Sequence, residues 1–138
     1  MKKKYLMLAI GAILSFSAQC QETQAKVSFH NGDRLSLSLF TTSKFYPEVQ
    51  IESNHLEIQD ARYAFLIRND VPVKELSLSW GIGYSYSDLY ESYCVLPIEL
   101  QKANVFSEHV TLSIGLEIAS DLIEETRIKP LIGVSINF

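Results

Sequence analysis

The sequence predicts an all-β protein: an antiparallel up-and-down β-barrel of about eight strands, which follows an N-terminal signal peptide. Three observations support this prediction. Apolar and polar residues alternate with a period of two along most of the chain, short turn signals separate the alternating segments, and no comparable segment has apolar residues at helical spacing. The 138 residues are 47% hydrophobic and 20% charged, which is typical of one folded domain.

The first twenty residues have the composition of a bacterial secretory signal peptide. Met1–Lys4 is basic, and Tyr5–Phe16 is an apolar run too short to cross a bilayer as a permanent helix. Ala18-Gln19-Cys20 fits the small-x-small pattern that signal peptidase cleaves, so we expect the mature chain to start at Gln21. Residues 1–20 are therefore predicted to be a signal peptide and residues 21–138 a single β-barrel domain.

Cys20 leaves an alternative open, a lipoprotein in which this cysteine carries acyl chains. The residues before it make a poor lipobox, because Gln19 is bulky and polar where a small residue is usual. If Cys20 leaves with the signal peptide, Cys94 is the only cysteine and no intramolecular disulfide forms. Stability must then come from closed β-pairing or from a well-packed core.

The alternation is clearest at 76–86, where Leu, Trp, Ile and Tyr share one face and Ser and Gly share the other. Residues 110–119 and 128–138 repeat this pattern. We predict strands at 25–30, 33–41, 46–52, 56–68, 74–86, 92–103, 109–119 and 126–138.

Turn signals fix the breaks between these strands, and Asn31-Gly32 is the strongest of them. Because the connections are too short for crossover helices, the pairing is expected to be antiparallel. The further predicted breaks are at 42–44, 53–54, 69–72, 88–91, 104–108 and 120–125.

Alternation alone is also compatible with a soluble sandwich, but the polar face favours a narrow lumen. In the two longest runs this face is rich in Ser and Gly, which suit the crowded interior of an eight-stranded barrel. We expect Ser79, Gly83, Ser113 and Gly133 inside, and Leu78, Ile82, Leu112, Leu116 and Ile132 outside. Charges of both signs point to the same face and are expected to pair across the lumen: Arg34, Arg62, Arg68, Glu99, Glu117 and Lys129. The alternative is that this face is the solvated surface of a sandwich.

Two features of the apolar face favour a membrane barrel. Four tyrosines flank one connection like an interfacial aromatic girdle, namely Tyr84, Tyr86, Tyr90 and Tyr93. The last alternating strand ends at Phe138, which resembles the assembly signal of bacterial outer-membrane barrels. With both ends of the barrel chain periplasmic, the connections facing outward are all expected to be short: 31–32, 52–55, 87–91 and 120–125.

Residues 61–138 resemble the small outer-membrane β-barrel proteins of Bacteroidetes. The resemblance rests on ARYAFLIRNDVPVKELSLSWGIGYSY at 61–86, on YCVLPIELQ at 93–101 and on the glycine-containing strand 110–118. The matching positions are Gly81, Gly83, Tyr84, Pro97, Ile98 and Gly115. This family supplies no catalytic residues to transfer, and residues 21–60 match nothing in it.

No pattern in the sequence predicts catalytic, cofactor-binding or metal-binding residues. His30, His55 and His109 lie far apart and are each expected at a turn or on the surface. Gly81-Ile82-Gly83 lacks the third glycine and the helix of a dinucleotide loop, and no Gly-x-Ser-x-Gly elbow occurs. The acidic segment 121–125 has the composition of a solvated loop, with a divalent-cation site as the alternative.

The charge balance argues against a nucleic-acid partner, because after residue 20 only nine Lys and Arg face sixteen Asp and Glu. We therefore expect an outer-membrane β-barrel with a membrane-structural or passive role and no catalytic activity. Its expected partners are outer-membrane lipid, lipopolysaccharide and, during biogenesis, the barrel-assembly machinery. The alternative is a soluble periplasmic or secreted barrel or sandwich, lipocalin-like, that binds a small apolar ligand with its apolar faces turned inward.

Overall fold

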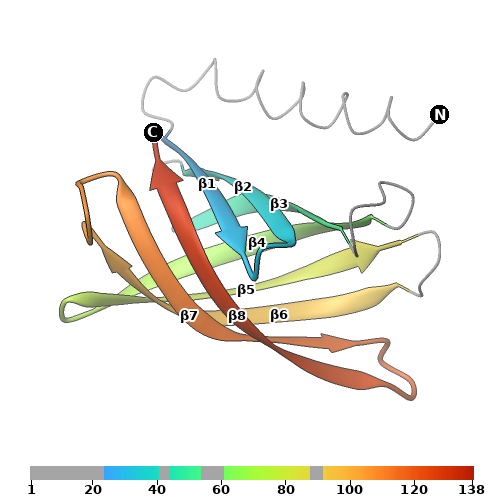
Figure 1. Ribbon diagram of the computed structural model, residues 1–138. Coiled ribbons are helices and arrows are strands. Elements are labelled where there is room, and N and C mark those ends of the chain that lie inside the picture. The colour runs from blue at the N-terminus through green and yellow to red at the C-terminus, as the bar shows by residue number, and fades with distance from the viewer. Residues whose placement is uncertain (1–23, 41–43, 54–60, 88–91) are drawn as a thin grey trace.

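The chain forms one closed antiparallel β-barrel (Figure 1). The computed structural model describes residues 24–40, 44–53, 61–87 and 92–138, so the predicted signal peptide lies outside the described residues. Each strand pairs with the next, and the last pairs with the first, which confirms the predicted eight-stranded up-and-down barrel. The strands are β1 (Gln24–His30), β2 (Arg34–Phe40), β3 (Phe45–Glu52), β4 (Arg62–Val73), β5 (Leu76–Tyr86), β6 (Tyr93–Ala103), β7 (Val110–Ser120) and β8 (Thr126–Asn137).

The up-and-down topology gives the barrel two distinct ends. The terminal end holds the start of β1, the end of β8 and the connections 41–44, 74–75 and 104–109 (Figure 1). At this end the Phe138 N–H donates to the Ala25 carbonyl over 2.8 Å. The hairpin end holds the connections 31–33, 53–61, 87–92 and 121–125. Of the predicted outward connection 52–55, residues 54–55 lie outside the described residues. In the described residues no helix is long and apolar enough to span a membrane.

The strand registers give the barrel a large stagger. Lys26 pairs directly with Asn137 across the β1–β8 seam. Followed the other way around the barrel, its neighbours are Ser38, Glu48, Leu66, Gly83, Val95, Ala119 and finally Arg127. The two positions on β8 differ by ten residues (137 − 127), which is the shear of the barrel. A stagger of this size tilts the strands steeply and leaves a lumen that side chains fill.

Strand length differs around the barrel wall. β1 and β2 have 7 residues each, whereas β8 has 12, so β1 stops halfway along its neighbour. The Asn31 side chain continues the ladder at this point: its amide donates to the Pro130 carbonyl over 2.8 Å and its oxygen accepts the Ile132 N–H over 3.0 Å. Asn31 and Gly32 have φ values of 54° and 78°, the left-handed conformation expected of an Asn-Gly turn.

One predicted break is wrong. β4 continues through 69–72, where Asn69, Asp70 and Pro72 pair with residues of β5. The chain turns instead at 74–75, and Lys74 takes a left-handed φ of 56°. Asn, Asp and Pro favour turns, but Asn69 still pairs with Phe45 of β3, and β4 extends past the end of β3 from Asp70 onward. Proline is tolerated at Pro72 because the strand there has only one neighbour. Part of the predicted strand 56–68, residues 56–60, lies outside the described residues.

Side chains alternate between the interior and the exterior as predicted. Of the residues predicted outside, Ile82 and Ile132 are 56% and 64% exposed, Leu112 and Leu116 are exposed, and Leu78 is half-buried. Of those predicted inside, Ser79, Ser113 and Gly133 are buried and Gly83 is half-buried. Tyr84 and Tyr86 point outward, but Tyr93 is buried, contrary to its expected place in an aromatic girdle; Tyr90 lies outside the described residues. Tyr93 has the inward parity of β6, shared with Val95 and Glu99.

Two inward glycines are required by close approach of neighbouring strands. A Cβ on Gly83 would lie 2.2 Å from the Phe65 carbonyl oxygen, and one on Gly115 would lie 2.0 Å from that of Ile98. Both distances are far below van der Waals contact, so no side chain fits without moving the backbone. Inside the barrel near the hairpin end, Ala64, Leu66, Tyr93, Val95 and Ala119 form a small apolar cluster.

Candidate functional site: the charged barrel interior

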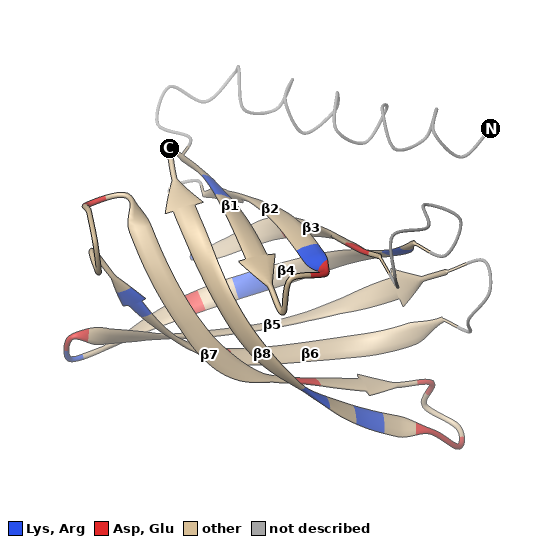
Figure 2. Cartoon of the chain, viewed as in Figure 1, with Lys and Arg blue, Asp and Glu red and all other residues tan. Residues whose placement is uncertain are grey.

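The interior of the barrel is built largely from polar and charged side chains. Figure 2 shows that β5 carries no charged residue, whereas β4 and the first half of β8 do. The buried polar set comes from strands all around the wall, and its charged members are Lys26, His30, Arg34, Glu48, Glu52, Arg68, Glu99 and Glu117. All of these except Lys26 belong to two hydrogen-bonded networks.

The first network is centred on Arg68, which lies between two carboxylates. Its Nη2 donates to Glu99 Oε2 over 2.6 Å, and its Nη1 donates to Glu48 Oε1 over 3.1 Å. Glu48 also accepts from Ser38 over 2.7 Å and from Gln50 over 2.6 Å. A buried charge is costly unless ion pairs and hydrogen bonds replace its hydration, and here each ion has both.

His30 extends this network, so its expected position at a turn or on the surface is wrong. It is 3% exposed, and its Nε2 lies 2.6 Å from Glu99 Oε1. Because β1 ends halfway along β8, the last residue of β1 faces the middle of the lumen, opposite Gly133. His109 lies in an exposed connection, as expected, and His55 lies outside the described residues.

The second network joins Arg34, Glu52, Glu117 and Lys129. Arg34 donates to both oxygens of Glu117, over 2.6 and 2.9 Å, and its Nη2 donates to Glu52 over 2.6 Å. Lys129 donates to the other Glu52 oxygen over 2.5 Å and lies 3.6 Å from Asp33. Two cations thus face three carboxylates at the place where the wall of β1 and β2 is short.

All six charges predicted to point inward do so. Arg34, Arg68, Glu99, Glu117 and Lys129 belong to the two networks, and Arg62 is half-buried with its guanidinium 5.3 Å from the centre of the Tyr93 ring. Four further buried charged or titratable residues were not predicted: Lys26, Glu48, Glu52 and His30. Their signal was present, because each alternates with apolar residues in the short segments 25–30 and 46–52.

A small cavity lies beside the second network. The cavity lined by Arg34, Glu52 and Glu117 has a volume of about 10 Å³, enough for roughly one water molecule. A much larger cavity of about 570 Å³ lies at the terminal end. Among the described residues, no group of three or more His, Cys, Asp or Glu is arranged to hold a metal ion.

The acidic connection 121–125 is ordered by its own hydrogen bonds. Asp121 Oδ1 accepts the N–H groups of Ile123, Glu124 and Glu125, each over 2.9 Å. These bonds, of which that from Glu125 has the largest effect, hold the pKa of Asp121 below its ordinary value. The Glu125 carboxylate in turn accepts from Arg127 and from the Tyr93 hydroxyl, over 2.7 and 3.1 Å.

The fold and interior define the chain as a closed eight-stranded β-barrel whose interior is built largely from polar side chains and whose outer wall exposes large apolar side chains. No protein-family model, curated protein or solved structure matches it.

Proposed function

We propose that this chain is an outer-membrane β-barrel protein with a membrane-structural or passive role and no catalytic activity. The observation that carries the proposal is the orientation of the side chains. The outer wall exposes large apolar residues on nearly every strand, for example Phe29, Leu35, Phe45, Phe65, Ile82, Leu100, Ile114 and Ile132. A soluble monomer rarely exposes contiguous apolar surface of more than a few hundred Å², whereas lipid solvates such a surface well.

Backbone pairing and strand length agree with this proposal. A closed barrel leaves no sheet edge around most of its circumference, which is what hydrocarbon requires of a spanning backbone. β4–β8 have 11 or 12 residues each, and a tilted transmembrane strand needs about 9–11. Trp80 and Phe45 contact each other edge to face on the outer wall, with ring centroids 6.2 Å apart, where aromatic side chains suit an interface with lipid.

The interior favours this role over that of a soluble lipocalin-like barrel. A small apolar ligand needs an apolar lumen, but here Arg68, Glu48 and Glu99 occupy the centre and the space beside Arg34 holds about one water. A sandwich is excluded because the sheet closes on itself. The same ion-paired centre favours a passive barrel over an open pore.

The remaining parts of the proposal follow from the sequence. We propose that residues 1–20 are removed on export, that Phe138 takes part in recognition by the barrel-assembly machinery, and that outer-membrane lipid and lipopolysaccharide surround the apolar wall. We also propose that the chain is related to the small outer-membrane barrels of Bacteroidetes. These proposals involve no cofactor and no nucleic acid.

Fractionation and heat-modifiable migration test the proposal together. The chain, expressed with its first twenty residues in a Gram-negative host, should appear in the outer-membrane fraction. After extraction it should need detergent to stay dispersed, and boiling should shift its migration on a gel. A chain that stays in the periplasmic fraction and remains monomeric without detergent would refute the proposal.

A further inference from the structure

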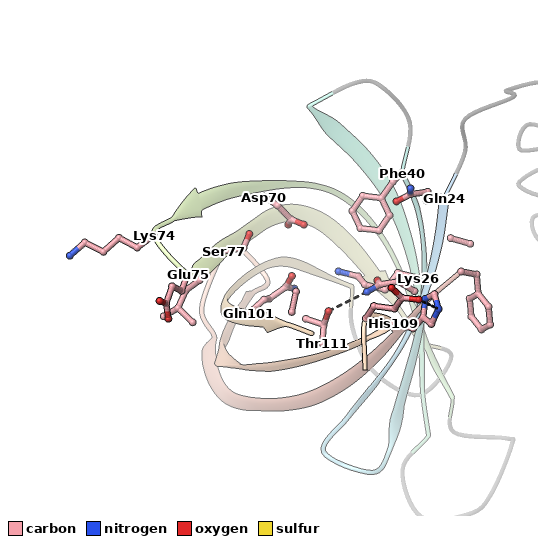
Figure 3. Close-up of a pocket in the computed structure, with 16 residues that line it drawn as sticks. Gln24, Lys26, Phe40, Asp70, Lys74, Glu75, Ser77, Gln101, His109 and Thr111 are labelled. Atoms are coloured by element: carbon pink, nitrogen blue, oxygen red, sulfur yellow. Dashed lines mark hydrogen bonds and ion pairs between the residues drawn. The ribbon is translucent and has the colours of Figure 1, made fainter. Parts of the chain in front are cut away.

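The cavity at the terminal end is large enough to hold a small molecule. Its volume of about 570 Å³ lies within the range of ligand pockets, roughly 300–1,000 Å³. Seven strands contribute to its lining, including β1 with Lys26, β4 with Asp70 and β6 with Gln101 (Figure 3). Both the interior networks and the apolar cluster lie deeper in the barrel, so neither fills this space.

Two buried polar side chains that line this cavity have no hydrogen-bond partner in the described part of the chain. Lys26 is 3% exposed and Gln101 is 7% exposed. The Lys26 ammonium lies 5.0 Å from the centre of the Phe40 ring and 5.7 Å from that of Tyr46, contacts that replace only part of its hydration. The Lys26 ammonium reaches the cavity unpaired, and a charged group on a side chain that is mostly buried favours an acceptor there.

An opposite charge faces the same space but forms no ion pair with Lys26. The Asp70 carboxylate lines the cavity and accepts from the Tyr46 hydroxyl over 2.8 Å through Oδ1, but no ion pair joins it to Lys26. Figure 3 shows Asp70 on one side of the opening, with Lys26 and Gln101 on others. Lys26 and Asp70 thus face the cavity as opposite charges that form no ion pair with each other.

We propose that this cavity binds a small zwitterion of amino-acid or dipeptide size, whose carboxylate accepts from Lys26 and Gln101 and whose ammonium donates to Asp70. A simple anion fits less well, because the lining contains three carboxylates, Asp70, Glu75 and Glu108, against two lysines. A simple cation would leave Lys26 without an acceptor. A zwitterion satisfies both sides at once, and the Phe40 ring offers an apolar contact beside it.

Dialanine and its end-blocked derivatives test the proposal. The ¹⁵N-labelled barrel, folded in detergent micelles, is titrated with L-alanyl-L-alanine while amide shifts of β1, β4 and β6 are followed. Saturable shifts in the millimolar range are expected. N-acetyl-dialanine lacks the ammonium and dialaninamide lacks the carboxylate, so each should bind about tenfold more weakly or worse, because each loses one charged hydrogen bond.

Variants locate the site. Lys26→Met and Asp70→Asn should each weaken dialanine binding about tenfold, while Lys102→Met, an exposed β6 lysine outside the cavity, should not. If Lys26→Met does not fold, Asp70→Asn and the blocked dipeptides still decide the question. The absence of saturable shifts would overturn the proposal, as would equal binding of the blocked dipeptides or unchanged binding to both variants. Heat-modifiable migration of the same samples tests separately whether the chain folds as a membrane barrel. A barrel that is heat-modifiable but does not bind dialanine would therefore overturn only the zwitterion site and not the proposed function.

Discussion

Arg34 on β2 and Glu117 on β7 form a two-pronged ion pair across the lumen, with both carboxylate oxygens accepting from the guanidinium over 2.6 and 2.9 Å. The two residues are far apart in sequence, and their side chains are 2% and 3% exposed. The pair links two strands, β2 and β7, that share no backbone hydrogen bonds. It is therefore expected to stabilise the closed barrel only while both partners are present.

Removing one partner of this pair should be strongly destabilising. Arg34→Met leaves Glu117 buried without a cation and is expected to cost about 3–5 kcal/mol. Arg34→Met combined with Glu117→Leu should recover part of that loss, because no uncompensated charge remains. Urea unfolding in phospholipid vesicles, followed by fluorescence of the single tryptophan, Trp80, measures these changes. The control, Arg127→Met, removes an exposed pair and should cost at most about 1 kcal/mol. Equal losses for Arg34→Met and Arg127→Met would contradict the burial argument.

A charge placed on the outer wall should reveal whether that wall faces lipid. Ile114 is 62% exposed in the middle of β7, so Ile114→Arg is expected to cost about 2–4 kcal/mol in a bilayer. The matched change Ile123→Arg lies in the exposed connection 121–125 and should cost about 0–1 kcal/mol. Unfolding in vesicles provides both values. If Ile114→Arg is tolerated as well as Ile123→Arg, the wall is not embedded in hydrocarbon.

Enlarging an inward glycine should overpack the lumen. Gly83→Phe and Gly115→Phe each require a Cβ about 2 Å from a backbone carbonyl oxygen, so each should cost 1–3 kcal/mol or more. Gly32→Asn is the control, because nothing lies within 4 Å of its Cβ and Asn tolerates the positive φ of 78°. The temperature at which the folded band disappears on a gel ranks the three variants. Unchanged temperatures for both phenylalanine variants would mean that the neighbouring strands do not approach Gly83 and Gly115 this closely.

The connection 121–125 should lose its order at low pH. Three N–H groups bond to Asp121 and lower the pKa of its carboxyl in the folded protein, so ionised Asp121 favours the ordered connection above its ordinary pKa of 3.8. That contribution should disappear as the pH falls through the lowered folded pKa. Amide shifts of Ile123, Glu124 and Glu125 should therefore titrate together with a midpoint below 3.8, and Asp121→Ala should abolish the transition. A midpoint above 3.8 would show that these bonds do not favour the ionised form.

The exported chain should begin at Gln21. The cleavage pattern Ala18-Gln19-Cys20 predicts a mature mass that lacks residues 1–20, which intact-mass measurement of membrane-extracted protein can verify. A mass that includes Cys20 with two or three acyl chains would instead identify a lipoprotein.

The sequence determined which residues face inward and which face outward, because successive side chains of a strand point to opposite sides whatever the strand pairs with. Leu116 and Ser79 could therefore be assigned to opposite faces from their neighbours alone. The antiparallel order followed as well, since the short connections join each strand to the next. The lumen-facing charges were predictable as a set, but their partners were not.

Only the tertiary structure decided which residues meet, because the shear of a barrel depends on the registers of all eight strands together. That stagger brings Arg34 to Glu117 and places His30, the last residue of a short strand, at the centre of the lumen beside Glu99. It also carries β4 past the end of β3, so that Asp70–Pro72 extend a strand although Asp and Pro favour turns. Local sequence encodes the pleat of each strand, whereas closure of the sheet sets where each strand ends and what its side chains contact.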